Sequence, residues 1–482
     1  MQKSMLKNSV FNIIYTASNI LFPFITSIYV SRILLPVGVG KVASAQNIAS
    51  YFVTAAALGL PSYGVREFAK VREDTAKKNS LFTELFIINL ISTTISLIAY
   101  IFVLILNNGF NGEGALYICC GLAIFFNYLN IDWIYQGLEE YGYITGRSVV
   151  IKCISLALLV VFVKTREDYV AYALLTSLAL GGNYIFNVIH ARKMVGFTLV
   201  NLKIRKHIKP IVFIAGIIFM STIYNKIDIT MLSALSTDEA VGYYSYAQRT
   251  VNIVLTMCSA VTAIFLPRLS YYYDNEKAVF YKLMDKGFQI LCLGVVPLAV
   301  GLFLTANQAV VLLYGDSFTP TGTTIKLMCP LILIKGFGDL LCYQLAYSSK
   351  NEYILLPGSA IASIINVITN SILIPLYAQN GAVIASVMSE LTNIIQFLYL
   401  KRKIKYHISN TALVLSLFST MVMAAVVCAI IKMNLPLAVA LAMEISIGGA
   451  IYLLMNIALK NRILSEMLTK VLKKHNTGFQ DS

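Results

Sequence analysis

The sequence is poor in charged residues and in the residue types that build catalytic and metal sites. Charged side chains make up 13% of its 482 residues, whereas soluble domains carry about a quarter. The four histidines stand at positions 190, 207, 407 and 475, and the eight cysteines all fall in apolar stretches without metal-ligand spacing. These shortages argue against a soluble domain, and they predict no metal site, no cofactor and no catalytic dyad.

Long polar segments are scarce as well. Three of the connections between apolar stretches are as short as STDEA, GDSFTPTG and YAQN. A membrane polymerase or ligase would need a sizeable external loop with clustered polar residues, and these connections are too short to fold as one. The chain also contains no phosphate-binding P-loop, so we do not expect it to hydrolyse ATP. The sequence therefore predicts that the protein is not an enzyme.

Hydrophobic residues fill most of the chain: they make up 58% of it, and the mean hydropathy is +0.74. A helix that crosses a lipid bilayer needs about 20 mostly apolar residues. We therefore expect an all-α polytopic membrane protein with about 14 transmembrane helices. The expected segments are 10–31, 42–65, 81–106, 115–136, 144–163, 168–190, 210–235, 241–266, 288–313, 326–347, 354–376, 381–400, 410–431 and 435–458.

The basic residues predict the orientation of these segments. If the N-terminus is cytoplasmic, the outer connections hold only a few of the 38 lysines and arginines. Basic residues concentrate on the cytoplasmic side of membrane proteins, so both termini are expected to be cytoplasmic. The net charge of +15 is then an orientation signal rather than a sign of a nucleic-acid partner. The basic residues left outside are Arg32, Lys41, Lys164, Arg166 and Lys432.

Two short blocks suggest an internal repeat. Residues 40–47 read GKVASAQN and residues 242–249 read GYYSYAQR, so that Gly, Ala and Gln align. Each block begins an expected segment that ends near Leu-Pro, at Leu60–Pro61 and at Leu266–Pro267. Because six segments separate the copies, both would have the same orientation, as in transporters built from parallel halves. Chance similarity between helix starts rich in Gly and Ala is the alternative.

The repeat leads us to expect three parts. They are an N-terminal six-helix lobe over 1–200, a C-terminal six-helix lobe over 201–405, and an extra helix pair with a basic cytoplasmic tail over 406–482.

Two motifs resemble those of a known family. SRILLPVGVGKVASA at 31–45 is similar to the R-x-L-G-P-x-x-x-G turn of polysaccharide-unit flippases, with Leu35 in place of the usual glycine. NKIDITMLSALSTDEAVGYYSYAQRTVNIV at 225–254, followed by FLPRLS at 265–270, is similar to the central motif of the same family. The chain thus resembles the Wzx-type flippases of polysaccharide and O-antigen repeat units, within the multidrug/oligosaccharidyl-lipid/polysaccharide exporter superfamily.

The resemblance implies two lobes around a central cavity with alternating access. It also implies an undecaprenyl-pyrophosphate-linked oligosaccharide as substrate, carried across the bacterial cytoplasmic membrane, with polysaccharide polymerase and glycosyltransferases as possible partners. Many members are predicted to have twelve segments, so the extra pair is a departure. That pair resembles the one in peptidoglycan lipid II flippases, which keeps a lipid II-type substrate open. A multidrug cation antiporter is less favoured, because the first segment, 10–31, has no acidic residue.

Basic residues within the apolar segments are the candidate substrate-binding residues. A charge near the bilayer centre costs about 2.5–3.5 kcal/mol on insertion scales, so such residues normally face a cavity or a partner. Arginine suits a pyrophosphate because its planar guanidinium binds phosphate oxygens bidentately. Lys152 could also extend to the membrane interface, and Arg32 could be a headgroup-level anchor. The five candidates are Arg249, Lys226, Lys152, Lys335 and Arg32.

Four residues are expected to support these cations. Asp228 lies at the depth of Arg249 and could form a bridge that only locks two helices. Asp339 follows Lys335 by four residues, so the two share a helix face and are expected to neutralise each other. Aromatic residues can stack on sugars, although tyrosines also gather at membrane interfaces for other reasons. The aromatic candidates are Tyr224 and Tyr246.

Overall fold

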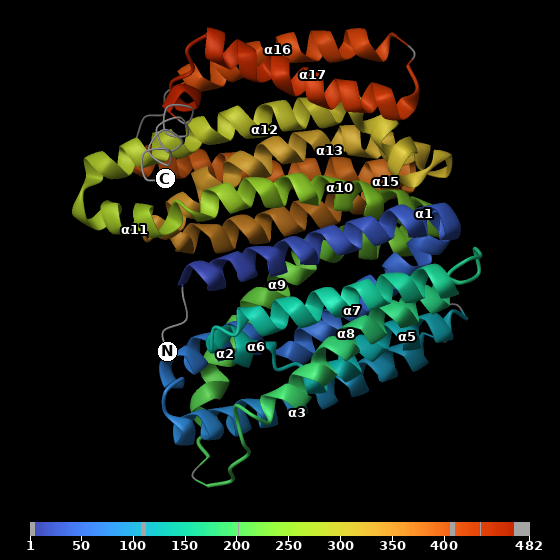
Figure 1. The fold of residues 1–482 in the computed structure, drawn as a ribbon, viewed down its shortest axis with the longest axis vertical. Coiled ribbons are helices and arrows are strands. Elements are labelled where there is room, and N and C mark those ends of the chain that lie inside the picture. Colours follow the sequence, from blue (N-terminus) through green and yellow to red (C-terminus); the bar gives the residue numbers. More distant parts are fainter. Residues whose placement is uncertain (1–4, 108–111, 201, 405–409, 434, 467–482) are drawn as a thin grey trace, which may run out of the picture. The chain divides into compact units, whose positions relative to one another are not determined.

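The computed structural model describes residues 5–107, 112–200, 202–404, 410–433 and 435–466, and Figure 1 shows its elements. Every element in these residues is a helix. The chain divides into two compact units, residues 1–242 and 243–482. The predicted all-α class is therefore confirmed, whereas the lobe boundaries at 200 and 405 stay predictions.

The first unit contains long helices joined by short connections. A 3₁₀ turn, Asn127–Leu129, separates two of the helices. The helices are α1 (Met5–Ala57), α2 (Leu60–Val71), α3 (Thr75–Leu106), α5 (Gly114–Phe126), α6 (Asp132–Gly137), α7 (Tyr141–Phe162), α8 (Tyr169–Ala191) and α9 (Arg205–Leu235).

The second unit begins within α10 (Asp238–Ala263). It includes a π-helical segment, Asp339–Gln344, between two α-helices. The other helices are α11 (Leu266–Asn275), α12 (Lys277–Tyr314), α13 (Thr319–Gly338), α14 (Leu345–Ser348), α15 (Leu355–Ile404), α16 (Thr411–Ile431) and α17 (Leu437–Ala458), with 3₁₀ turns at Asp316–Phe318 and Glu352–Ile354.

Ten helical stretches in the described residues are long and apolar enough to cross a membrane. Two of them, Val10–Val71 with 62 residues and Glu352–Ile404 with 53, are each long enough for two crossings. Within these stretches, α1 and α15 each contain one residue with a positive φ, Leu35 (φ 57°) and Ala378 (φ 46°), where the chain turns between two helices. With the shorter apolar helix Gly114–Leu129 and α13, the structure agrees with the expected number of about 14.

The side chains are distributed as expected for a protein surrounded by lipid. Large apolar residues face outward: Phe213 is 72% exposed and Leu356 is 75% exposed. Polar residues such as Asn89 and Asn370 are instead buried. Lipid is as apolar as leucine, so membrane helices associate through close packing and hydrogen bonds rather than through hydrophobic burial. The polar side chains inside each unit are therefore the groups to search for a binding site.

The two repeated sequence blocks take the same local form. α1 is followed by α2, which begins with Leu60 and Pro61, and α10 is followed by α11, which begins with Leu266 and Pro267. In both short helices proline stands in the first turn, where its missing N–H is not needed. A long helix follows in each case, α3 from residue 75 and α12 from residue 277.

Candidate functional site

The fourth membrane segment of the first unit is interrupted, and polar side chains of α3 bind at the interruption. Asn89 Nδ2 donates to the Asn127 carbonyl at 2.8 Å. Asn127 Nδ2 in turn donates to Thr93 Oγ1 at 2.9 Å and to Asn89 Oδ1 at 3.1 Å. A helix can break at membrane depth when neighbouring side chains satisfy the freed backbone groups. Because these asparagines bind groups at the break, one helix can end at Phe126 and the next, α6, can begin at Asp132.

Packing fixes α6 in place. Trp133 is 1% exposed and lies edge-on to Phe68 of α2, with ring centroids 5.1 Å apart. The Tyr135 hydroxyl donates to the Asn187 carbonyl of α8 at 2.6 Å. A methyl group at Gly64 would collide with the Trp133 ring, so this contact with α2 needs a glycine. Asp132 is thus held by rigid neighbours on both sides.

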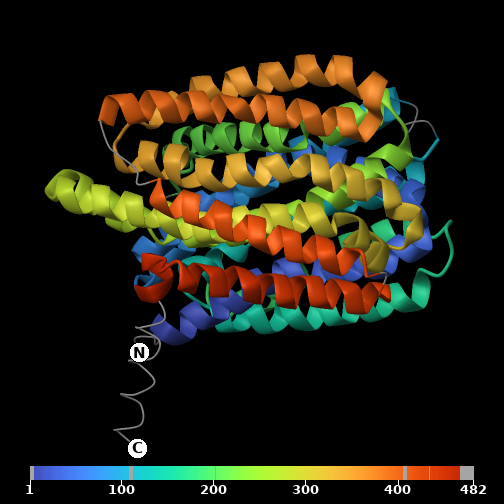
Figure 2. The same ribbon diagram turned by 90° about the horizontal axis from the view of Figure 1, so that it is seen from above.

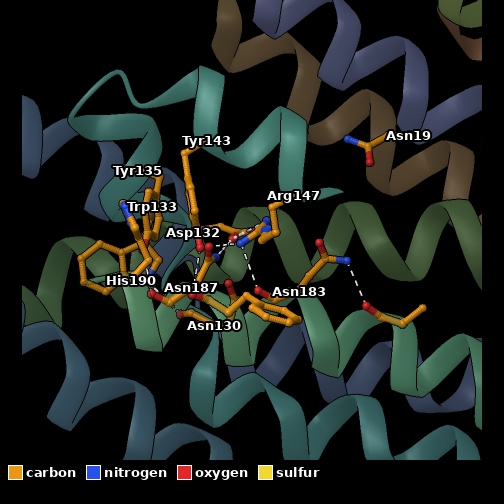
Figure 3. A network of polar contacts seen from close by, with 12 residues as sticks. Asn19, Asn130, Asp132, Trp133, Tyr135, Tyr143, Arg147, Asn183, Asn187 and His190 are labelled. Atoms are coloured by element: carbon orange, nitrogen blue, oxygen red, sulfur yellow. Dashed lines mark hydrogen bonds and ion pairs between the residues drawn. The ribbon is translucent and has the colours of Figure 1, made fainter. Parts of the chain in front are cut away.

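Asp132 is the centre of the polar network in Figure 3. Arg147 of α7 forms an ion pair with it, with 3.5 Å between Nη2 and Oδ1, and Asn187 Nδ2 also donates to Oδ1. Arg147 Nη1 donates to the Asn183 carbonyl at 3.0 Å and to Asn187 Oδ1. The Arg147 side chain is 6% exposed. The carboxylate therefore has a cation from its own unit.

Sequence reasoning missed this network. Arg147 lies within the expected segment 144–163 but is not among the five predicted binding residues. In the structure it is the seventh residue of α7. Its position inside an apolar segment was the signal that could have identified it, because a buried arginine needs a partner.

Lys152, one of the predicted binding residues, lies on α7 beyond Arg147 and turns toward α1. Its Nζ donates to Asn19 Oδ1 at 2.6 Å and to Ser18 Oγ at 3.2 Å. The ammonium also lies 6.0 Å from the ring centroid of Tyr15 and 5.9 Å from that of Phe22. In the described residues these uncharged groups are its partners, and no carboxylate bridges it. The site therefore keeps a net positive charge that an anion can neutralise.

Two other predicted cations belong to the first unit. Lys226 on α9 is partly buried, and no carboxylate among the described residues of this unit forms an ion pair with it. The same turn is tied to α1, because Asn47 Nδ2 donates to Thr230 Oγ1 at 2.8 Å and to the Lys226 carbonyl at 3.3 Å. Arg32 is exposed, three residues before the left-handed Leu35. Of the supporting residues, Asp228 is buried and Tyr224 is partly buried.

Glu113 joins three helices at one end of the first unit. Lys41 of α1 forms an ion pair with it, and the Tyr169 hydroxyl of α8 donates to Oε2 at 2.8 Å. Partial burial works against the charged form, but the hydrogen bonds from Lys41 and Tyr169 hold the pKa of Glu113 below its usual value. Lys41 is therefore engaged in a structural pair.

In the second unit, Arg249 lies over the ring of Tyr246, with its guanidinium carbon 5.4 Å from the ring centroid. Tyr246 is 2% exposed. Its ring stacks on Phe318 at 4.9 Å and meets Tyr314 edge-on at 4.6 Å. Protein groups thus pack against the ring of Tyr246, and the tyrosine positions the arginine through a cation–π contact. Its expected role in stacking on a sugar stays a prediction.

Lys335 and Asp339 have different partners from those expected. Lys335 Nζ forms an ion pair with Glu390 Oε1 of α15 at 2.9 Å. Asp339 accepts a hydrogen bond from Thr262 of α10. The two residues were expected to neutralise each other on one α-helical face. The Asp339 N–H still bonds to the Lys335 carbonyl, so the two residues keep their α-helical spacing, but each side chain binds a residue of another helix instead.

The fold and these buried charges define a membrane transporter or flippase. The chain belongs to a family described as polysaccharide biosynthesis proteins, whose profile matches residues 5–272.

The chain is also similar to a curated protein and to solved structures. A putative O-antigen transporter of Escherichia coli (strain K12) is 21% identical over 359 residues, which are 73% of this chain and 86% of the relative. The solved structure of the lipid II flippase MurJ, in an inward closed conformation, has a TM-score of 0.65 at 15% identity, covering 91% of this chain and 99% of that one.

An inward-facing multidrug resistance MATE family transporter has a TM-score of 0.59 at 16% identity, covering 80% of this chain and 94% of that one. At such low identities, the solved structures show a shared fold.

Proposed function

We propose that the protein is a flippase that moves a polyprenyl-pyrophosphate-linked oligosaccharide across the bacterial cytoplasmic membrane by alternating access. The similarity to a putative O-antigen transporter and the fold shared with a lipid II flippase both support a lipid-linked glycan as substrate. In this proposal the charged and sugar-bearing headgroup passes through the protein while the polyprenyl chain stays in lipid. The substrate is taken from the cytoplasmic side, on which both termini lie.

The observation that carries the proposal is the environment of Lys152. A lysine held by a hydroxyl and an amide, with Arg147 one and a half turns away, is a positive centre inside an apolar segment. A diphosphate supplies the missing negative charge, and its oxygens accept hydrogen bonds from the ammonium. The neutral Ser18 and Asn19 then contribute polar contacts without adding competing charge.

Arg249, Lys226 and Arg32 are proposed to bind the same headgroup at other stages of transport. Lys335 is a weaker candidate, because Glu390 already neutralises it. Polysaccharide polymerase and glycosyltransferases are the proposed functional partners, since they would consume and supply a lipid-linked oligosaccharide.

The charge arrangement does not favour export of cationic drugs. An antiporter for cations needs a carboxylate that is available to its cargo. In the first unit Asp132 is bound by Arg147 and Asn187, and the first segment contains no acidic residue. A cationic cargo would therefore meet positive charge at Lys152.

The test is to replace Lys152 by Gln and by Arg in cells and to measure lipid-linked oligosaccharide on each leaflet. Loss of one charged hydrogen bond is worth about 1.5–3 kcal/mol, or roughly 10–100-fold in the amount transported. We expect Lys152→Gln to accumulate substrate on the cytoplasmic leaflet, and Lys152→Arg to retain transport. Arg249→Ala and Arg249→Lys form a second pair, for which the same difference is expected.

Lys164→Gln is the matched control, because Lys164 is an exposed residue in the connection that follows α7. It should leave the distribution of substrate unchanged. Normal surface glycan in Lys152→Gln and Arg249→Ala, at protein levels equal to those of the parent, would remove both residues from the substrate path.

A further inference from the structure

The C-terminal helix pair contains a carboxyl group that is not part of the cationic sites. α16 and α17 pack against each other and against α12, as Figures 1 and 2 show from two directions. Glu444 of α17 is 2% exposed, and both of its carboxyl oxygens are buried without a hydrogen-bond partner in the described residues. An isolated acidic side chain in such surroundings requires an explanation, because burying an unpaired charge is strongly unfavourable.

One polar side chain approaches this carboxyl group. Gln308 of α12 lies beside it, and Gln308 Oε1 is also buried without a partner. Glu444 is the eighth residue of α17, about 10 Å from the start of that helix. Gln308 lies six residues before the end of α12, or about 9 Å. The two unsatisfied groups therefore meet at similar depth, where one helix begins and the other ends.

The packed helices provide no cation for Glu444. α16 has no charged residue, and α17 has none besides Glu444. The charged residues of α12 all lie in its first ten positions, the last being Lys286, which is about 33 Å from Gln308 along the helix. Tyr452, two turns away on α17, is bonded to Ser416 and to the Leu293 carbonyl. The other titratable groups of the three helices are the exposed Cys428 of α16 and Tyr281, Cys292 and Tyr314 of α12.

Protonation of Glu444 gives a hydrogen-bond partner to both unsatisfied groups, the Glu444 carboxyl group and Gln308 Oε1. As a carboxylate, Glu444 can only accept hydrogen bonds, so the Gln308 amide nitrogen can donate to it but Gln308 Oε1 stays without a donor. As a neutral acid, it carries one O–H that can donate to Gln308 Oε1. Its other oxygen remains able to accept from the Gln308 amide nitrogen. Protonation also removes the charge from an interface that contains no cation.

We propose that Glu444 is a proton-binding site, whose protonated form bonds to Gln308 and holds α17 against α12. Release of the proton leaves a carboxylate that needs water, so it loosens the contact of the helix pair with α12. This inference goes beyond the proposed transport function, because it concerns a different ligand and a different part of the chain.

The first test is labelling of the purified full-length protein with dicyclohexylcarbodiimide, a hydrophobic reagent that modifies protonated carboxyl groups, followed by peptide mass spectrometry. We expect modification at Glu444 that decreases as the pH is raised. The matched control is Glu390, which is 4% exposed but forms an ion pair with Lys335, and which should remain unmodified. Glu390→Gln should leave labelling at Glu444 unchanged.

The second test is infrared spectroscopy during a pH titration. The parent protein should show a neutral-carboxyl C=O band that titrates, and Glu444→Gln should lack it. Glutamine has nearly the same shape as a protonated glutamic acid and can still bond to Gln308, so this variant is expected to fold. Absence of the band in the parent, or a band and a labelling yield that do not change with pH, would overturn the proposal.

Discussion

Each unit contains one irregular membrane segment that is built differently from the other, although an aspartate stands at the irregular turn in both. In the first unit the helix stops after Phe126, passes through a 3₁₀ turn and resumes at Asp132. In the second unit the chain stays helical and passes through a π-helical segment that begins at Asp339. The two units thus accommodate a partly buried carboxyl group in two ways.

The two units also differ in how their buried charges are compensated. Asp132 is bound by the cation Arg147, whereas Asp339 is bound by the neutral hydroxyl of Thr262. Conversely, Lys152 has uncharged partners, whereas Lys335 is neutralised by Glu390. The comparison teaches that similar helices can carry different electrostatics, and it is the reason why the anion site is proposed at Lys152 rather than at Lys335.

The largest expected effect comes from removing Arg147. Arg147→Met leaves the Asp132 carboxylate without its cation. Removing one partner of a buried ion pair costs about 3–5 kcal/mol of folding free energy. We expect about 3 kcal/mol here, because Asp132 is partly exposed. Thermal unfolding in detergent measures the loss. Thr262→Val, the corresponding change beside Asp339, should cost less. Adding Asp132→Asn to Arg147→Met should restore part of the stability, and a single variant as stable as the parent would contradict the argument.

The next effect concerns Glu84 on α3. Glu84 is 1% exposed and accepts hydrogen bonds from the Lys203 backbone N–H at 2.6 Å and from His207 Nε2 at 2.7 Å, and it forms an ion pair with Lys206. Glu84→Gln should destabilise the protein by about 2 kcal/mol, as expected for hydrogen bonds to a buried charge. It should also increase proteolysis near residue 203. Unchanged protection of this region would show that Glu84 does not anchor it.

A smaller effect, this time a gain in stability, is expected from substitutions at Leu35 and Ala378, the positive-φ residues inside α1 and α15. Ala378→Gly in the second unit should stabilise the protein by about 1 kcal/mol, because a residue with a Cβ is strained at positive φ. Leu35→Gly in the first unit should stabilise the protein less than Ala378→Gly does, because it also removes a partly buried apolar side chain. Melting temperatures of both variants test this order. A lower melting temperature for Ala378→Gly would mean that the left-handed turn is not strained.

The smallest effect is expected at Lys286, which lies 202 residues after Glu84, at the corresponding position of α12. Lys286 Nζ pairs with Glu466 at 2.7 Å, but both side chains are more than a third exposed. Exposed pairs contribute little, so Lys286→Gln should barely change the melting temperature.

The pH dependence of this pair has a defined sign. Hydrogen bonds from Lys286 and Arg462 lower the pKa of Glu466. The stability that this pair contributes is therefore fully present above the ordinary pKa of a glutamate, and it is lost as the pH falls through the lowered pKa of Glu466. The melting temperatures of Lys286→Gln and of the parent should therefore converge at acidic pH. A difference in melting temperature that grows at acidic pH would contradict a stabilising Lys286–Glu466 pair.

The sequence predicted the membrane segments well because their signal is local. Twenty apolar residues in a row are visible without knowledge of neighbours, and the Leu-Pro pairs at residues 60 and 266 mark real helix starts. The segment expected at 115–136 was wrong in one respect, because the helix breaks after Phe126. That break depends on Asn89 and Thr93, which are distant in sequence.

The partners of the buried charges could not be predicted in the same way. Lys335 has Asp339 four residues away in sequence but pairs with Glu390, which lies 55 residues further along the chain. Helical spacing describes only neighbours on one helix, whereas a buried charge takes the best partner that any packed helix provides. Glu390 and Glu444 both lie in expected membrane segments, and the structure separates them into a paired and an unpaired carboxyl group.

The π-helical segment Asp339–Gln344 changes the direction in which the side chains face along one membrane segment of the second unit. Its hydrogen bonds span five residues rather than four, so one turn holds a surplus residue. Because each α-helical residue turns the chain by about 100°, side chains from Leu345 onward face a different direction from those of an uninterrupted helix. If the surplus residue migrates along the helix, one half of the segment rotates relative to the other while every peptide group keeps a helical partner.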